Sequence, residues 1–303
     1  MSQDFKIATL IVSSNTYPAT RNSKIQKKLF FEQPIEEDLT FWYRGNSGKK
    51  LSKKYELIGN ELIIDTDDSS LNMGLKTLLA FEWLLKNRDF DYIVRPTPSS
   101  YVNFKNLQNY IYKNLLNEKY VYCGKVQTTN DKNGNKINFI SGSTFILNKN
   151  SVKKILENKE KWDHSYWDDV ALSLLMSKLN IKYQVGKRYD VEGNPFLKDI
   201  PTTHYQYRCR ADNHYSYPRF LEANTLSAIH KITYKNKISF FKKNILNLYY
   251  RISKFFYIYQ FGWKLFVILR KFLKTVIPKK LYKVFKKMFQ KNIDHFKHVR
   301  FKY

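Results

Sequence analysis

Short apolar, strand-like runs alternate with helix-like segments through residues 1–234, and this alternation constrains the fold more than any other feature. The strand-like runs are Ile7–Val12, Leu62–Asp65, Tyr92–Arg95, Tyr120–Val126 and Phe139–Leu147. The helix-like segments are Leu71–Lys86, Phe104–Leu116, Ser151–Leu156 and Asp168–Leu179. Strands that alternate with helices predict an α/β sheet covered by helices. Asn133-Gly134, before the last strand-like run, predicts a hairpin turn.

The net charge of +27 is distributed unevenly along the 303 residues. Residues 235–303 contain 19 Lys and Arg residues and a single acid, Asp294, whereas residues 1–234 contain 34 basic and 25 acidic residues. In Ile238–Tyr259 and Trp263–Val276, aromatic and aliphatic residues are interleaved with Lys or Arg every three or four positions. We therefore divide the chain into an α/β domain, residues 1–234, and a basic aromatic helical tail, residues 235–303.

The tail predicts a peripheral attachment to a membrane. No window of 18 residues within it is free of charge, so a transmembrane helix is not expected. Basic helices with aromatic residues suit a membrane interface, where lysines face anionic head groups. Helices that pack on the domain with a solvated basic face remain an alternative. Nucleic-acid binding is a weaker one, because a basic aromatic tail alone is little evidence for it.

The ends and the cysteines of the chain predict its compartment. Residues Met1–Lys6 lead directly into the first strand-like run, so we expect no signal peptide. Cys123 and Cys209 are too few for a disulfide framework, and their spacing matches no zinc pattern. We expect a cytoplasmic protein, peripheral at the inner face of the membrane.

The segment Leu62–Leu107 holds most of the residues that predict chemistry. It contains a strand, a helix that begins near Leu71, and a second strand that ends in the polar loop Thr97-Pro98-Ser99. A polar loop after a buried strand is a common ligand site in α/β enzymes. Read alone, Asp65-Thr66-Asp67 is also a D-x-D pattern, which could hold a metal ion.

The order of residues in this segment resembles that of the β-1,3-galactosyltransferase and fringe-type glycosyltransferases. These proteins read D-x-x-D-S-Y-x-N-L-T-x-K-T, then a helix, then Y-x-x-K-T-D-D-D-x-F-V-N. The matching residues here are Asp65, Asp68, Ser69, Asn72, Leu75, Lys76, Thr77, Tyr92, Arg95, Tyr101, Val102 and Asn103.

Three further blocks in the same order extend the resemblance over about 220 residues, while the tail lies outside it. Ser13-Ser14 followed by Arg21 resembles the family's S-S-x(n)-R nucleotide-binding element. Ile140–Leu147 is similar to its C-S-G-G-G-Y-V-L strand, and Trp167–Val170 is similar to its E-D-V motif.

The resemblance implies a GT-A fold, here a single Rossmann-like domain, and a function. That function is inverting transfer of a hexose or N-acetylhexosamine, of the β-1,3 type, from a UDP-linked donor to a glycolipid or lipid-linked saccharide, as in polysaccharide biosynthesis. The residues implied in donor binding are Ser13, Ser14, Arg21, Asp68, Lys76, Arg95, Thr97 and Ser99. Gly142 and Ser143 are implied near the diphosphate or the acceptor.

The family's metal-binding D-D-D triplet falls on Thr97-Pro98-Ser99, which has no carboxylate. Hydroxyl groups are poor substitutes for the oxygen ligands that Mg²⁺ and Mn²⁺ prefer. We therefore expect transfer without a metal cofactor. The alternatives are a Mn²⁺ or Mg²⁺ site at Asp65 and Asp67, or a degenerate, inactive site. Asp65 or Asp68 could instead contact the base or ribose, or cap the next helix with Ser69 and Ser70.

Without a metal ion, the positive charge for the diphosphate must come from side chains. If Thr203–Arg210 is extended, its period of two places His204, Gln206, Arg208 and Arg210 on one face. The resemblance also implies a late His, which the family places near the metal ion. This face is the predicted diphosphate site. A surface strand with solvated arginines is the alternative.

Asp169, the second acid of the E-D-V-like motif, is implied as the general base, with Asp168 as the second candidate. Two acids at the start of a helix otherwise only complement the helix dipole. Trp162, Tyr166 and Trp167 either stack on sugars or belong to the core. The competing function is that of a non-catalytic carbohydrate- or nucleic-acid-binding protein on a degenerate GT-A fold.

Overall fold

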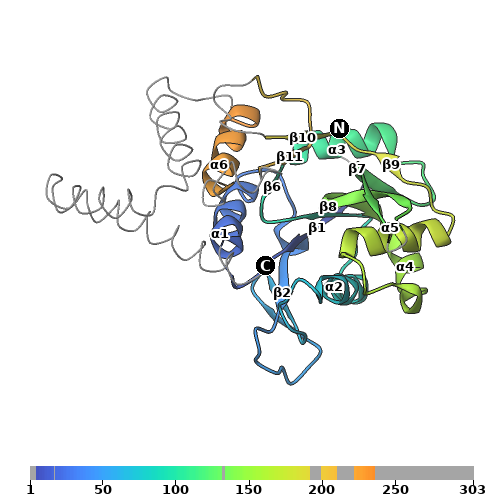
Figure 1. The fold of residues 1–303 in the computed structure, drawn as a ribbon. Helices are drawn as coiled ribbons and strands as arrows, with labels where there is room; N and C mark the ends of the chain where they lie inside the picture. The colour runs from blue at the N-terminus through green and yellow to red at the C-terminus, as the bar shows by residue number, and fades with distance from the viewer. Residues whose placement is uncertain (1–4, 17, 132–133, 192–198, 210–221, 236–303) are drawn as a thin grey trace, which may run out of the picture.

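A mixed sheet of eight strands forms the centre of the structure, a computed structural model that describes residues 5–16, 18–131, 134–191, 199–209 and 222–235 (Figure 1). The strand order is β3-β4-β2-β1-β5-β8-β7-β9. Their bounds are β1 Ile7–Val12, β2 Thr40–Gly45, β3 Tyr55–Ile58, β4 Glu61–Ile64, β5 Tyr92–Pro96, β7 Tyr122–Asn130, β8 Lys136–Asn148 and β9 Gln184–Val185. The predicted tail lies outside the described residues apart from Lys235.

Four neighbouring strands of the sheet run in parallel. β1 pairs in parallel with both β2 and β5, and β2 pairs in parallel with β4. The carboxyl ends of these four strands therefore lie at one edge of the sheet. β8 is antiparallel to both β5 and β7. The predicted hairpin is confirmed by the β7–β8 pairing, and Gly134 in its turn has a φ of 84°, which favours glycine.

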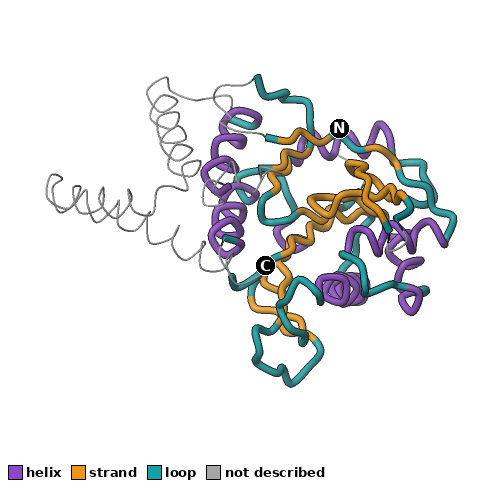
Figure 2. The backbone as a smooth tube through the Cα atoms, viewed as in Figure 1, coloured by secondary structure: helices purple, strands orange, loops and turns teal. Residues whose placement is uncertain are grey.

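Helices cover both faces of this sheet (Figure 2). One core contains residues of α2 (Met73–Asn87), α4 (Lys149–Leu156) and α5 (Asp168–Lys178). The other contains residues of α1 (Ala19–Phe30), α3 (Phe104–Asn114) and α6 (Glu222–Thr233). The short 3-10 helices η1 (Glu37–Leu39) and η2 (Lys159–Lys161) lie in connections. In α3, for example, Phe104, Leu107 and Ile111 recur at helical spacing and are buried.

A second sheet of three short strands, in the order β10-β11-β6, brings distant segments to the end of β5. These strands are β6 Ser100–Val102, β10 Arg188–Asp190 and β11 Gln206–Arg208. Arg208 is paired with both Ser100 and Asp190. The loop that follows β5 therefore lies against residues that are about a hundred positions later in the chain.

The α/β prediction is confirmed, and all nine predicted elements are present. The five predicted strands correspond to β1, β4, β5, β7 and β8, and the four predicted helices correspond to α2, α3, α4 and α5. Both cysteines are free and buried. Within the described residues, no helix combines the length and apolarity needed to cross a membrane.

A buried ion pair joins the carboxyl ends of β1 and β2 to α2. Lys76 Nζ lies 2.9 Å from Asp68 Oδ1, and the Lys76 side chain is only 1% exposed. Asp68 also accepts hydrogen bonds from the backbone N–H groups of Gly45 (3.0 Å) and Asn15 (3.1 Å). Burial alone would raise the pKa of Asp68, but these hydrogen bonds and Lys76 lower it below the usual value. Asp68 is therefore an ionised anchor for three segments.

We expect Asp68→Asn to lower the free energy of unfolding by about 3–5 kcal/mol, because it leaves the buried ammonium of Lys76 without a counter-charge. Denaturant unfolding measures this, and the exposed neighbour Asp67 supplies the control, Asp67→Asn. Adding Lys76→Met to Asp68→Asn should recover part of the loss.

The same pair predicts the pH dependence of stability. Folding lowers the pKa of Asp68, so the ionised carboxylate stabilises the folded protein. This stabilisation is fully present above the unfolded pKa of about 3.9, and it is lost as the pH falls through the folded pKa. If Asp68→Asn lowers the free energy of unfolding by less than about 1 kcal/mol at pH 7, Asp68 is not the ionised anchor described above.

Candidate functional site

The predicted site residues gather at the edge of the sheet where the four parallel strands end. Ser13 and Ser14 follow β1, Asp65 and Asp68 follow β4, and Thr97 follows β5. The Asn46 side chain, which follows β2, donates a hydrogen bond of 2.6 Å from Nδ2 to Asp65 Oδ1. The loops at the carboxyl ends of parallel strands are the usual place for a ligand on such a sheet.

Arg95 is the centre of a buried network below this edge. Its guanidinium is 2% exposed and forms an ion pair with Asp168. It also donates from Nη1 to the Gly142 carbonyl oxygen (2.7 Å) and from Nε to the Tyr43 hydroxyl (2.9 Å). Burial alone would lower the pKa of Arg95, but the charge of Asp168 raises it, so the guanidinium stays protonated. Arg95 thus fixes the start of α5 against β5 and β8.

Asp169 is held at the first turn of α5, close to β8. Its Oδ2 accepts a hydrogen bond of 2.7 Å from the backbone N–H of Gly142. A Cβ atom added at Gly142 would lie only 3.0 Å from this oxygen, so glycine allows the carboxylate to approach the strand. Burial first, and then the charge of Asp168, raises the pKa of Asp169. A carboxylate with a raised pKa is a stronger base at neutral pH.

The loop after β5 is fastened to β8 through Ser143. The Ser143 carbonyl oxygen accepts from the Thr97 N–H (2.9 Å) and from the Ser100 hydroxyl (2.7 Å). The Thr97 and Ser99 hydroxyl oxygens lie 3.3 Å apart, and Gln26 Nε2 donates to the Thr97 carbonyl oxygen (3.0 Å). The loop is therefore a fixed group of hydroxyls, with Thr97 partly exposed.

Arg188 contacts Ser143, the residue that holds this loop, and Arg188 was not among the site residues predicted from the sequence. Its Nη1 donates a hydrogen bond of 2.9 Å to the Ser143 hydroxyl, to which Gln206 Nε2 also donates (2.9 Å). Its Nη2 donates to Asp190 Oδ2 at 2.9 Å, and its side chain is 1% exposed. The alternation Arg188-Tyr-Asp190 is the only sequence signal for this short strand, and two polar residues with one tyrosine are too few to predict burial.

The predicted face of His204, Gln206, Arg208 and Arg210 is only partly present. Gln206 and Arg208 lie in β11, but the strand begins at Gln206, so the period of two does not extend back to His204. The His204 ring instead lies 6.1 Å from the Tyr189 ring and 6.3 Å from the Tyr207 ring. Burial, and then the charge of Lys187, lowers the pKa of His204. Arg210 lies outside the described residues.

Several predicted donor contacts point into the protein rather than to the edge. Lys76 and Arg95 are buried and form ion pairs with Asp68 and Asp168, respectively. Arg21 donates to the Asn224 side chain in α6 at 3.3 Å. By contrast, Ser14 is partly exposed at the end of β1.

The residues at the edge do not fit the metal site that the family resemblance implies. Thr97, Pro98 and Ser99 stand where that site would have three acids. Asp65 accepts hydrogen bonds from Asn46 and from the Leu51 N–H. In the described ranges, no group of three or more His, Cys, Asp and Glu side chains is arranged to hold a metal ion.

The structure separates the three aromatic residues that precede the two acids. Trp162 is buried in the core, where its indole faces Gly74, and Tyr166 is partly buried beside the same core. Trp167, which directly precedes Asp168, is 62% exposed. The core interpretation therefore holds for Trp162 but not for Trp167.

The chain is similar to several solved structures. One is a glycosyltransferase involved in the glycosylation of the major capsid of PBCV-1, with 13% identity, a TM-score of 0.45, and 74% of this chain and 99% of that chain covered. Another is the glycosyltransferase GlyE of Streptococcus pneumoniae TIGR4, with 13% identity, a TM-score of 0.39, and 78% and 66% covered.

A third similar structure is Staphylococcus aureus TarS 1–349 in complex with UDP, with 12% identity, a TM-score of 0.37, and 86% of this chain and 75% of that chain covered. No curated protein matches the chain significantly.

The family model described as galactosyltransferase matches residues 47–186. This range runs from the loop after β2 to the end of β9, and it includes Asp68, Arg95, Gly142 and Asp169. Residues 47–186 are therefore similar to the galactosyltransferase family of glycosyltransferases.

Proposed function

We propose that the chain is an inverting hexosyltransferase, which moves a hexose or N-acetylhexosamine from a UDP-sugar to a hydroxyl group of a saccharide acceptor. The observation that carries this proposal is the carboxylate of Asp169. It lies at the carboxyl edge of the sheet, is held by the Gly142 N–H, and has a pKa above the usual value. The resemblance to the β-1,3-galactosyltransferases supports a β-1,3 linkage.

In the proposed reaction, Asp169 takes the proton of the acceptor hydroxyl group. The acceptor oxygen forms a bond to the anomeric carbon of the donor sugar, from the face opposite to the diphosphate. The bond between that carbon and the diphosphate oxygen breaks, and UDP leaves with the electron pair. One displacement of this kind inverts the configuration at the anomeric carbon. Arg95 and Asp168 position α5, so that Asp169 has a fixed orientation.

We place the diphosphate at the hydroxyl loop Thr97–Ser99. The positive charge there comes from Arg208 and Arg188, since the register of the small sheet sets Arg208 opposite Ser100 and Arg188 donates to Ser143. Arg188 forms an ion pair with Asp190, and Arg208 is the second basic residue beside the loop. Side-chain charge in this place supports transfer without a metal cofactor.

We further propose that the acceptor is a glycolipid or lipid-linked saccharide at the cytoplasmic face of a membrane. The composition of residues 235–303 supports this proposal, with 19 basic residues interleaved with aromatic ones. Such a tail would hold the catalytic edge near an acceptor that is confined to the bilayer.

Replacing the base tests the mechanism. We expect Asp169→Asn to lower kcat by about 10²–10⁴-fold, the span for a general base, with little change in the donor KM. The exposed carboxylate of Glu160 provides a matched control, Glu160→Gln, that keeps wild-type turnover. Because a base must be deprotonated and the pKa of Asp169 is raised, activity should fall on the acid side at a pH above about 3.9.

More than about a third of wild-type turnover in Asp169→Asn would show that another group takes the proton. If the wild-type chain neither transfers nor hydrolyses any UDP-sugar, the non-catalytic binding protein becomes the better interpretation.

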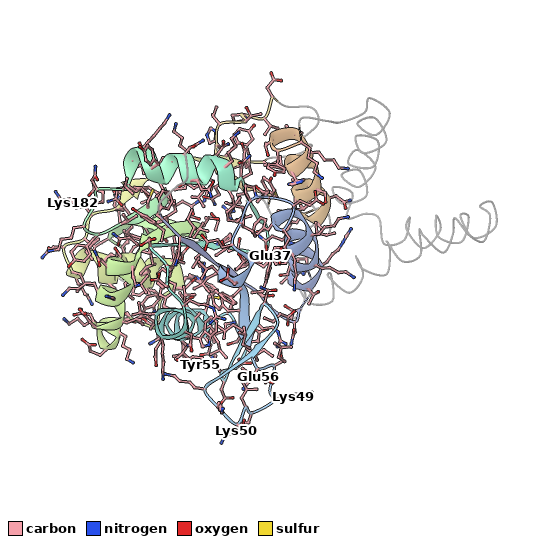
Figure 3. All side chains as sticks on the ribbon, turned by 180° about the vertical axis from the view of Figure 1, so that it is seen from behind. Glu37, Lys49, Lys50, Tyr55, Glu56 and Lys182 are labelled. Carbon is pink, nitrogen blue, oxygen red and sulfur yellow. The ribbon has the colours of Figure 1, made fainter. Side chains whose placement is uncertain are left out.

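Chelation and charge removal test the diphosphate site. We expect turnover to persist in excess EDTA and to change little with added Mn²⁺. Arg208→Ala should lower kcat by about 10²–10³-fold, the cost of a contact that strengthens in the transition state. Lys182→Ala is the control, because Lys182 lies at the outer margin of the molecule (Figure 3). Complete loss of turnover in EDTA, restored by Mn²⁺, would refute metal independence and return attention to Asp65 and Asp67.

A truncation after Lys235 tests the membrane proposal. Each basic residue near an anionic surface contributes about 1 kcal/mol, so loss of residues 236–303 should abolish sedimentation with anionic vesicles. Hydrolysis of a soluble UDP-sugar should change much less. Vesicle binding by the truncated chain equal to that of the full chain would rule out the tail as the attachment. Unfolding of the truncated chain would instead show that the tail packs on the domain.

A further inference from the structure

Within the described part of the chain, the exposed indole of Trp167 makes no hydrogen bond or ring contact, and we propose that it is the platform on which the acceptor saccharide stacks. This inference rests on the proposed transferase function and deepens it. Trp167 is 62% exposed, whereas the other described tryptophans, Trp42, Trp83 and Trp162, are 3%, 7% and 4% exposed. Burying an aromatic ring is favourable, so a large indole that faces water is available for a ligand.

The backbone around Trp167 is held on both sides. Before it, Trp162 is buried against Gly74, and Asp163 accepts a hydrogen bond of 2.9 Å from the Ser165 N–H. After it, Asp168 is fixed by the ion pair with Arg95. The Trp167 carbonyl oxygen also accepts from the Ala171 N–H at 2.8 Å, which is the first turn of α5. The ring is therefore presented from a fixed backbone, which lowers the entropic cost of binding.

Trp167 lies two positions before the candidate base, Asp169. Consecutive Cα atoms are about 3.8 Å apart, so the Cα atoms of Trp167 and Asp169 lie within about 7.6 Å of each other. A pyranose has an apolar face of C–H groups and a rim of hydroxyl groups. Stacked on the indole by that face, it can direct one rim hydroxyl to the Asp169 carboxylate. An aromatic face beside a hydrogen-bonding group is typical of small-ligand sites.

The local charge favours a saccharide over a lipid surface. An exposed Trp also occurs at membrane interfaces. However, residues 163–169 contain three acids, Asp163, Asp168 and Asp169, and no Lys or Arg. The exposed Asp163 would repel an anionic membrane, whereas a neutral sugar hydroxyl can donate a hydrogen bond to the Asp169 carboxylate. The structure thus assigns an uncharged pyranose as the ligand of Trp167.

The test compares Trp167→Ala, Trp167→Phe and Tyr112→Ala in the full chain. Tyr112, on α3, is an aromatic control of similar exposure, 55%, on the other face of the sheet. We expect Trp167→Ala to raise the acceptor KM by about 10- to 100-fold, the range for an aromatic anchor, while the donor KM stays as in the wild type. Trp167→Phe should keep most of the affinity, and Tyr112→Ala should keep all of it.

A binding measurement separates this inference from the transferase proposal. Calorimetric titrations use methyl β-D-galactopyranoside, methyl β-D-glucopyranoside and methyl N-acetyl-β-D-glucosaminide as probes. Saturable binding that Trp167→Phe keeps and Trp167→Ala loses supports the platform, even if the wild-type chain transfers no sugar. An unchanged acceptor KM in Trp167→Ala, or no binding of any of the three probes, overturns it. Loss of sedimentation with anionic vesicles in Trp167→Ala would assign the indole to the membrane instead.

Discussion

The buried ion pair between Arg95 and Asp168 is the interaction on which the arrangement of the site depends. Arg95 lies near the end of the central strand β5, and its guanidinium contacts β8 through Gly142, β2 through Tyr43 and α5 through Asp168. A buried guanidinium without a carboxylate would be costly, so the start of α5 has to meet the end of β5. That meeting places the next residue, Asp169, at the Gly142 N–H. Asp169 therefore has its orientation because the neighbouring Asp168 pairs with the buried charge of Arg95.

Ser143 has a similar role for the hydroxyl loop Thr97–Ser99. Its carbonyl oxygen holds the loop after β5, and its hydroxyl group accepts from Arg188 and Gln206. Gly142 and Ser143 are adjacent, and side chains alternate between the two faces of a strand. One short segment of β8 therefore joins the candidate base on one face to the basic residues on the other.

Periodicity predicted the long elements because they bury one continuous apolar stripe or run, as in α2 and β1. It missed α1, whose buried face includes the polar residues Asn22 and Gln26. Gln26 is buried because it donates to the carbonyl oxygens of Thr97 and Ser100, which are more than 70 positions away. A partner so distant in the chain leaves no local pattern that could reveal the burial of a polar side chain.

The sequence by itself determined the α/β class, the order of the main strands and helices, and the two acids at the start of α5, because local propensity and spacing specify them. Only the tertiary structure decided which charged groups are available to a ligand. It buried Lys76 and Arg95 in ion pairs, and it placed the His204 ring beside the rings of Tyr189 and Tyr207. It also brought Arg188 to the Ser143 hydroxyl and left Trp167 exposed. The physical reason is that burial and pairing depend on contacts between segments that are far apart in the chain, whereas periodicity reports only on neighbours.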